Sequence, residues 1–272
     1  MAIPSVKLTQ GIHVQHLFFR VDRVRWSALP AGESAATRDR LDALARKYPG
    51  PAAPRISTYA GVGGKADIGF MIYAAELQQL SAMQREVELA FPAGTLQPVY
   101  SYLSVTELPE YVTTDDDLKR MIQHGERKLQ PGTPEFDEAF AAAKQRNEEY
   151  KHYRLNPEMQ DWEIMCFYGM SKKRDLADNW YMLDFDARKK LMGSHAKTGR
   201  KFAGRISQLI TGSTGLDEYE WGVKLIAHNL DAVKEIIYEM RFDEVSARYG
   251  EFGPFYINLR LQPADLWEHL RL

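Results

Sequence analysis

The residues most able to do chemistry together lie in one short stretch, "FYGMSKKRDLADNWYML", residues 167–183. Tyr168 is followed four residues later by Lys172, and His195 lies a dozen residues beyond the end of the stretch. A tyrosine beside a run of cations is typical of a binding site for an anionic, oxidisable ligand. The alternative is an exposed turn between a strand and a helix, which is the preferred interpretation for Lys173 and Arg174.

His195 is the candidate metal ligand. In "KKLMGSHAKTGRK" it follows Met192 by three residues and Leu191 by four, so the three side chains share the inward-facing stripe of a helix. A lone histidine on such a stripe is more often a core residue, but neutral imidazole is a common axial ligand of haem iron. The sequence has no C-x-x-C-H motif, and its six other histidines lack the paired spacing of a zinc site.

The elements that must position these residues occur in one order twice, β-α-β-β-α-β, which is the pattern of a ferredoxin-like unit. Hydrophobic periodicity predicts the strands and helices of both copies. The first copy is predicted at residues 11–23 (strand), 34–48 (helix), 55–61 and 66–74 (strands), 75–91 (helix) and 99–108 (strand). The second is predicted at 161–170 (strand), 185–202 (helix), 205–213 and 219–228 (strands), 230–249 (helix) and 251–261 (strand).

Each copy would form a four-stranded antiparallel sheet with helices on one face only. Packing the two open faces together buries both, so the sequence predicts an α+β fold in which two ferredoxin-like modules form a pseudo-symmetric dimeric α+β barrel. The expected boundaries are 1–111 for the N-terminal module, 112–158 for a charged linker and 159–272 for the C-terminal module. Strong helix formers at 134–153 predict that part of the linker is helical.

The composition restricts the possible partners. A formal charge of -2 over 272 residues gives no bulk electrostatic reason to expect nucleic acid or an anionic membrane as a partner. The N-terminus lacks the apolar core of a signal peptide, and no stretch approaches the length of a membrane span. The single cysteine, Cys166, lies in an apolar run and is expected to be inert. We therefore expect a cytoplasmic protein.

Five stretches between Phe167 and Ile257 carry a resemblance: "YGMSKKR", "NWYML", "LMGSHAKTGRKFAGRISQLITGS", "DEYEWGVKLIA" and "YEMRFDEVSARYGEFGPFY". They resemble the chlorite dismutase superfamily, in particular its branch of hydrogen peroxide-dependent coproheme decarboxylases. In the first half, "GVGGKADIGFMI" and "YSYLSVTEL" match more loosely. The linker matches only near "YRLNP", and Gly169 stands where many relatives have proline.

The resemblance implies that two propionates of iron coproporphyrin III (coproheme) are oxidatively decarboxylated to vinyl groups with hydrogen peroxide, giving haem b. It implies that His195 is the proximal iron ligand, that Tyr168 takes hydrogen from the first propionate, and that Lys172 pairs with the second. Gln208 falls at the distal position, where the chlorite-degrading branch has arginine; a neutral amide suits neutral peroxide rather than an anionic oxidant. The other implied ligand-binding residues are Arg154, Met170, Trp180, Arg241 and Ser246.

Several alternatives stay open. Gln208 could be an ordinary polar strand residue, and Met170 and Trp180 could equally be core residues. A chlorite dismutase or a haem peroxidase would have no need of Tyr168 and Lys172, and a non-catalytic haem-binding or haem-sensing protein would show no turnover. The resemblance also implies a homo-oligomer, usually a pentamer, and a transient encounter with coproporphyrin ferrochelatase. The sequence does not decide whether Asp243 or Glu244 orients the imidazole.

Overall fold

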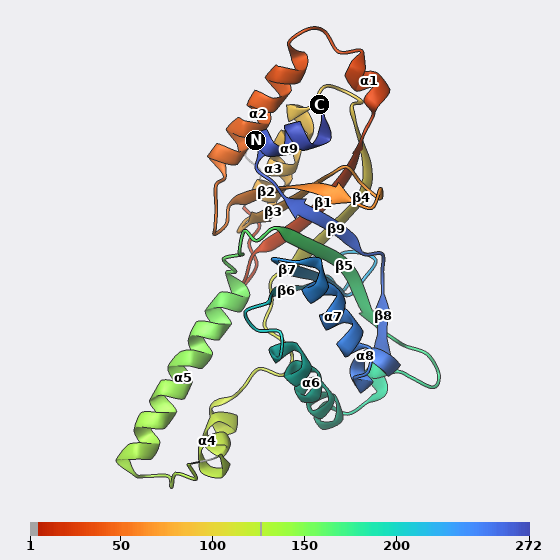
Figure 1. Ribbon diagram of the computed structural model, residues 1–272. Helices are drawn as coiled ribbons and strands as arrows, with labels where there is room; N and C mark the ends of the chain where they lie inside the picture. The colour runs from red at the N-terminus through yellow and green to blue at the C-terminus, as the bar shows by residue number, and fades with distance from the viewer. Residues whose placement is uncertain (1–4, 126) are drawn as a thin grey trace.

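The strands of the chain close on themselves to form a barrel. The computed structural model describes residues 5–125 and 127–272, and within them nine strands join one sheet in the order β7-β6-β4-β1-β3-β2-β9-β5-β8. An additional pairing of β5 with β7 closes the first eight strands into a ring. Figure 1 shows the strands in the middle of the molecule, with helices above and below them.

The N-terminal module supplies four neighbouring strands of this ring. All seven residues of β3 are buried, because one face of the strand meets helices and the other faces the barrel interior. The elements of this module are β1 (His13–Val21), α1 (Arg23–Ser27), α2 (Glu33–Lys47), β2 (Arg55–Val62), β3 (Ile68–Ala74), α3 (Leu77–Ala90) and β4 (Leu96–Val105).

The C-terminal part of the chain supplies the other strands and a second helical layer. Its elements are β5 (Ile164–Lys172), the 3-10 helix η1 (Trp180–Met182), α6 (Phe185–Arg200), β6 (Ile206–Gly212), β7 (Trp221–Ala227), α7 (Leu230–Met240), α8 (Glu244–Tyr249), β8 (Gly250–Phe252), β9 (Tyr256–Arg260) and α9 (Pro263–Leu270).

Two antiparallel pairings between the modules complete the barrel. Strand β2 pairs with β9, for example Tyr59 with Arg260, and β4 pairs with β6 at Val105 and Gly212. The predicted fold of two ferredoxin-like modules in an α+β barrel is therefore confirmed. The open faces are joined by strand pairing as well as by packing, and a buried cluster that includes Phe18, from β1, fills the interior.

Two predicted elements of the second copy are interrupted in the structure. The single helix expected at 230–249 is wrong: α7 ends at Met240, and the Asp243 side chain accepts hydrogen bonds from the backbone N–H groups of Val245 and Ser246 to start α8. The single strand expected at 251–261 is also wrong. Pro254 lies between β8 and β9 and has no N–H to donate to a neighbouring strand.

The linker forms a pair of helices, α4 (Asp115–His124) and α5 (Pro134–Leu155), that extends away from the barrel in Figure 1. Helix α5 confirms the predicted linker helix, whereas α4 was not predicted from the sequence. Thr114 caps α4 through a reciprocal pair of hydrogen bonds with Asp117. The Asp117 carboxylate also pairs with Lys189 at 3.1 Å, so the linker is fastened to α6 of the C-terminal module.

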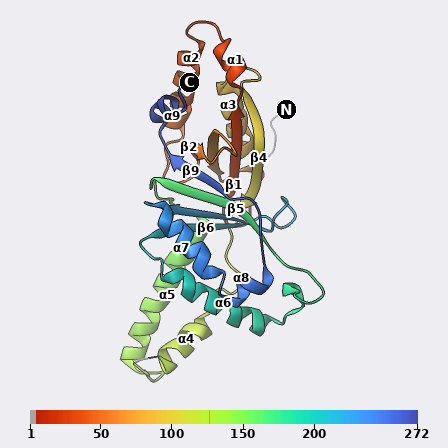
Figure 2. The same ribbon diagram turned by 45° about the vertical axis from the view of Figure 1, so that its right-hand side comes forward.

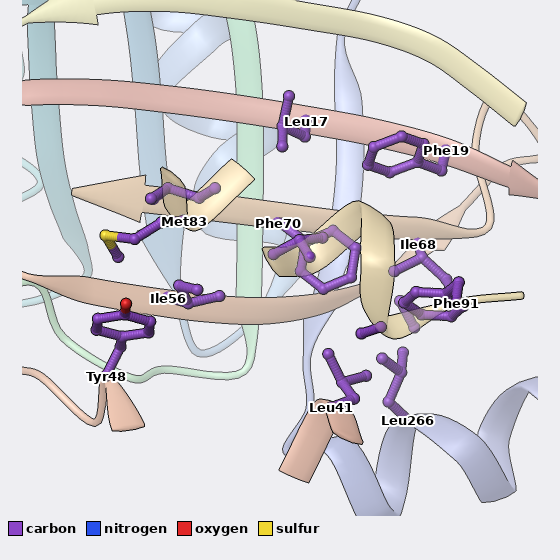
Figure 3. Packing of buried hydrophobic residues seen from close by; sticks show 14 of the residues in the cluster. Leu17, Phe19, Leu41, Tyr48, Ile56, Ile68, Phe70, Met83, Phe91 and Leu266 are labelled. Atoms are coloured by element: carbon purple, nitrogen blue, oxygen red, sulfur yellow. The ribbon is translucent and has the colours of Figure 1, made fainter. Parts of the chain in front are cut away.

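The last helix, α9, returns to the N-terminal module. Leu266 lies beside Leu41 of α2 in the core that Figure 3 shows from close by. The Trp267 ring lies 5.8 Å from that of Phe91 and 5.3 Å from that of Trp26. The helix-covered face of the N-terminal sheet is therefore filled by apolar side chains. In the part of the chain that the structure describes, none of the helices is both long and apolar enough to cross a membrane.

Candidate functional site

The candidate residues gather on the helix-covered face of the C-terminal sheet. Successive residues of β5 point to opposite faces, so Tyr168, Met170 and Lys172 face helices α6 to α8 while Phe167 faces the barrel interior. Gln208 of β6 lies across Leu225 of β7 in the pairing register and shares that face. The Cα atoms of Tyr168 and Lys172 are roughly 13 Å apart along the strand, a span comparable with the width of a porphyrin.

Tyr168 is a buried phenol in an aromatic and aliphatic surrounding. Only 4% of the residue is exposed, and its ring lies 4.4 Å from the Phe255 ring and 6.0 Å from the Phe252 ring. Burial raises the pKa of the Tyr168 hydroxyl well above its ordinary value, so the phenol is protonated at neutral pH. Such a group can lose an electron and its proton together to a strong oxidant.

Lys172 is a buried cation without a matching anion. The residue is 6% exposed, and its Nζ lies 4.7 Å from the centroid of the Trp180 ring. Burial lowers the pKa of Lys172 to about 8, although the carboxylates of Asp243 and Glu220 act to raise it. Within residues 5–125 and 127–272, no ion pair includes Lys172, so a ligand carboxylate at this position would gain a charged partner.

His195 is held in one orientation by a carboxylate. Its Nδ1–H donates to Oδ2 of Asp243 at 2.9 Å, and the Ser246 hydroxyl donates to the same oxygen at 3.1 Å. This bond leaves the lone pair on Nε2, which is the nitrogen that a metal would take. Glu244 instead pairs with Arg248 at 3.2 Å. The structure therefore selects Asp243 from the two carboxylates that the sequence left open.

Helix α6, which carries His195, is only partly covered. It has no buried residue, and its inward stripe of Leu191 and Met192 packs against the cluster formed by Trp180, Val245 and Tyr249. The corresponding helix of the first module, α2, has a fully buried leucine and is packed by α9. The two helices therefore differ in how far their side chains are covered, and Figure 2 shows α6 below the strands of the C-terminal part.

Three further candidate residues surround this face. Arg154, in the last turn of α5, donates to the carbonyl oxygen of Ile210 at 3.4 Å, and its buried Nε has no hydrogen-bond partner among the described residues. Arg241 is exposed, and its guanidinium lies 4.1 Å from the centroid of the Phe252 ring, which also contacts Tyr168. Ser246 is linked to His195 through Asp243. The structure thus brings the predicted residues to one region.

The side chains of this region suit a metal that is bound in an anionic macrocycle better than they suit a bare metal ion. One imidazole is available, and no group of three or more His, Cys, Asp or Glu side chains that could hold a bare metal ion occurs in the described ranges. The unpartnered guanidinium nitrogen of Arg154 and the unpaired ammonium of Lys172 are suited to carboxylates. An iron porphyrin with several propionates would satisfy both requirements.

Two residues that matter here gave little signal in the sequence. Glu220 is buried next to Lys172, but nothing in "DEYEWGVK" distinguishes it from the partly exposed Asp217 and the exposed Glu218. Arg188 donates to the Tyr111 hydroxyl at 3.0 Å, which ties α6 to the segment between β4 and α4. Cys166 lies on the same face as Tyr168, and burial raises the pKa of its thiol to about 12, which agrees with the expected inert thiol.

The geometry defines a class of protein: a closed barrel of two ferredoxin-like modules with one available imidazole and several cations on the helix-covered face of the second module. Comparison with known families gives the same result. The family described as chlorite dismutase matches residues 34–261. The chain belongs to the chlorite dismutase family.

Solved structures with the same fold include several members of this family. A heme-binding protein from Thermus thermophilus is 36% identical, with a TM-score of 0.77 over 99% of this chain and 98% of that one. A variant of chlorite dismutase from Candidatus Nitrospira defluvii is 18% identical, with a TM-score of 0.71 over 97% and 98% of the two chains. A putative chlorite dismutase is 16% identical, with a TM-score of 0.66 over 96% and 99%. The last two support the fold alone.

Proposed function

We propose that the protein is a hydrogen peroxide-dependent coproheme decarboxylase, which converts two propionates of iron coproporphyrin III to vinyl groups and releases haem b. The observation that carries this proposal is the placement of a protonated, buried phenol and an unpaired, buried ammonium on one face of β5, beside an imidazole on α6. The bound iron porphyrin, as substrate, supplies the redox chemistry that transfers the oxidising equivalents of peroxide.

His195 and the surrounding cations bind and orient the substrate. Nε2 of His195 takes the iron, while Asp243 keeps the proton on Nδ1. Each propionate that leaves water costs several kcal/mol unless it is compensated. Arg154 and Arg241 offer planar guanidinium groups for carboxylates, and the likeness to a heme-binding protein at 36% identity supports a haem-type ligand.

Tyr168 is the proposed hydrogen carrier for the first propionate. The phenol would give up one electron and one proton to the substrate that peroxide has oxidised, and the resulting phenoxyl would take a hydrogen atom from the propionate carbon that is bonded to the porphyrin ring. Loss of a second electron and of CO2 leaves a vinyl group. Each decarboxylation consumes one hydrogen peroxide and one proton and yields one CO2 and two waters, so atoms and charge balance.

Lys172 is proposed to hold the second reactive propionate. Its ammonium lies at the far end of the same strand face and is fixed over the Trp180 ring. Gln208 is proposed to lie above the iron, where its neutral amide can donate to or accept from neutral hydrogen peroxide. Arginine at this position would instead favour an anionic oxidant such as chlorite.

The proposed reaction is tested by adding hydrogen peroxide to the coproheme complex and following the mass of the porphyrin. Two successive losses of about 46 mass units each, CO2 plus two hydrogens, are expected. Bleaching of the Soret band without mass loss would instead support a haem-binding or haem-sensing protein. Rapid consumption of chlorite with dioxygen release, and no mass loss, would support a chlorite dismutase, which the family match also allows.

Tyr168→Phe and a matched control test the assigned residue. Phenylalanine keeps the ring that packs on Phe255 but cannot carry hydrogen, so binding should persist and the first mass loss should stop. Tyr238→Phe changes an exposed tyrosine of α7 and should leave both losses intact. Normal turnover by Tyr168→Phe would refute the role of this residue.

The partner enzyme, the compartment and the oligomeric state are proposed from the assigned reaction and from the family resemblance. A protein that decarboxylates coproheme needs a ferrochelatase that inserts iron into coproporphyrin, so a transient encounter with that enzyme in the cytoplasm is expected. A homo-oligomeric ring, most simply a pentamer, is proposed from the family resemblance. Analytical ultracentrifugation measures the subunit number directly.

A further inference from the structure

Glu220 is a buried carboxylate to which the reaction as proposed assigns no role. It lies directly before β7, opposite the end of β5, and its side chain is only 9% exposed. A carboxylate taken out of water is unfavourable unless several donors surround it. The contacts of the Glu220 carboxylate therefore indicate which parts of the structure it positions.

The first contact fixes the end of β5. The backbone N–H of Lys172 donates to Oε2 of Glu220 at 2.8 Å, and this bond is buried. The N–H of Glu220 in turn donates to the Ser171 hydroxyl at 3.2 Å. Lys172 is the last residue of β5, so these two bonds determine where its side chain leaves the strand.

The second set of contacts fixes the segment that returns over Lys172. Arg174 lies 3.7 Å from Oε1 of Glu220. Burial and a hydrogen bond to the Glu220 carboxylate raise the pKa of the Tyr181 hydroxyl. Tyr181 is the neighbour of Trp180, whose ring lies under the Lys172 ammonium at 4.7 Å. One carboxylate thus holds both the lysine and the ring on which it rests.

The third observation concerns charge. The carboxylates that favour the charged form of Lys172 are Asp243, at the start of α8, and Glu220, before β7. Asp243 is already occupied by the imidazole of His195 and the Ser246 hydroxyl. Arg174, two residues further along the chain than Lys172, is paired to Glu220 itself. Of these two carboxylates, Asp243 is hydrogen-bonded to the candidate iron ligand His195, whereas Glu220 is not.

We infer that Glu220 is the positioning residue of Lys172: it fastens the end of β5 to the segment 173–182 and adds to the negative charge around the buried Lys172 ammonium. This inference rests on the proposed function, in which Lys172 serves the second propionate. Loss of the Glu220 charge should therefore slow the second decarboxylation and spare the first. A residue that only holds a loop would affect both steps alike.

Glu220→Gln is the variant that tests the inference. The amide keeps an oxygen that can accept the Lys172 N–H, but the charge is lost. Glu251→Gln is the matched control, because Glu251 is exposed and lies opposite Ser171 on β8. Glu220→Asp restores the charge on a shorter side chain and should return the properties of Lys172 toward those of the wild type.

The first measurement uses the protein without porphyrin. Competitive acetylation followed by mass spectrometry gives the pH midpoint at which the Lys172 amine becomes reactive. The midpoint should fall in Glu220→Gln and stay unchanged in Glu251→Gln. A fall of one pH unit lowers the ratio of charged to neutral Lys172 by about tenfold at a given pH. An unchanged midpoint in Glu220→Gln would overturn the inference, whatever the activity.

The second measurement follows both decarboxylations at pH 8. In Glu220→Gln the porphyrin with three propionates should accumulate. If the midpoint falls by one unit from about 8, the charged fraction of Lys172 at pH 8 falls from about one half to about one eleventh, so the second step should slow about fivefold. Equal slowing of both steps would overturn the inference in favour of a purely structural role. If the midpoint shifts but the wild type releases no CO2, the link between Glu220 and Lys172 stands and the proposed function is refuted.

Discussion

The hydrogen bond between His195 and Asp243 decides which imidazole nitrogen is available to iron, and Asp243→Asn tests this directly. The asparagine oxygen can still accept the backbone N–H groups of Val245 and Ser246 that start α8. Its amide nitrogen, however, takes the place of the oxygen that now accepts from Nδ1. An amide donates there, so it favours the tautomer with the proton on Nε2 and removes the lone pair that iron needs.

The expected magnitude follows from these contacts. Loss of a carboxylate that orients a metal-bound histidine lowers metal affinity by about 10- to 100-fold, which is about 1.4–2.7 kcal/mol of binding free energy. Because the helix cap is retained in Asp243→Asn, the free energy of unfolding should change little. Asp243→Ala also loses the cap of α8, and should lower the free energy of unfolding by about 0.5–2 kcal/mol in addition.

The assay is a titration of each porphyrin-free protein with iron porphyrin, followed by the Soret band, together with urea unfolding. Glu244→Gln is the matched control, since Glu244 is the adjacent carboxylate and pairs with the exposed Arg248 rather than with the imidazole. It should bind iron porphyrin as the wild type does. Wild-type affinity and an unchanged spectrum in Asp243→Asn would refute the reasoning about the imidazole.

Three further predictions concern the interior, the core and the distal residue. Lys224 is fully buried inside the barrel, and burial together with Arg55 lowers its pKa far below the ordinary value. The unfolded chain therefore binds a proton at Lys224 that the folded chain does not. As the pH falls below about 10, this difference lowers the free energy of unfolding progressively. Lys224→Met should raise the free energy of unfolding at pH 7 by about 1–3 kcal/mol and flatten its pH dependence in urea titrations from pH 6 to 9; a less stable variant would contradict this. Trp267→Ala removes the α9 side chain from the first core and should cost about 3–5 kcal/mol of unfolding free energy, whereas a cost under 1 kcal/mol would mean that α9 is not part of that core. Gln208→Arg should strengthen azide binding to the iron porphyrin complex about tenfold, seen as a shift of the Soret band; unchanged azide affinity would place Gln208 away from the distal side.

Local patterns in the sequence were sufficient for most of the fold. The alternation in "IMCFYGMSK" sets Tyr168 and Lys172 on one face of β5, and the spacing of Leu191, Met192 and His195 sets the inward stripe of α6. These features depend on periods of two and 3.6 residues, which the sequence displays directly. The roles of the residues themselves came from the family resemblance, and they stay predictions.

What the sequence missed depends on contacts between distant segments. The break between α7 and α8 arises because the Asp243 side chain competes for backbone N–H groups, while the apolar periodicity continues through it. Helix α9 is short, and its partners lie more than two hundred residues away in α2. Glu220 meets Lys172 only through the register of β5 against β7. No local pattern encodes that register.

A crystal structure of the coproheme complex before peroxide is added tests most directly whether one iron porphyrin lies between α6 and the face of β5, as we propose. We expect iron bound to Nε2 of His195, one propionate beside the Tyr168 hydroxyl and another beside Nζ of Lys172, with all four propionates intact. Iron bound through another residue, or a porphyrin whose propionates reach neither Tyr168 nor Lys172, would contradict it.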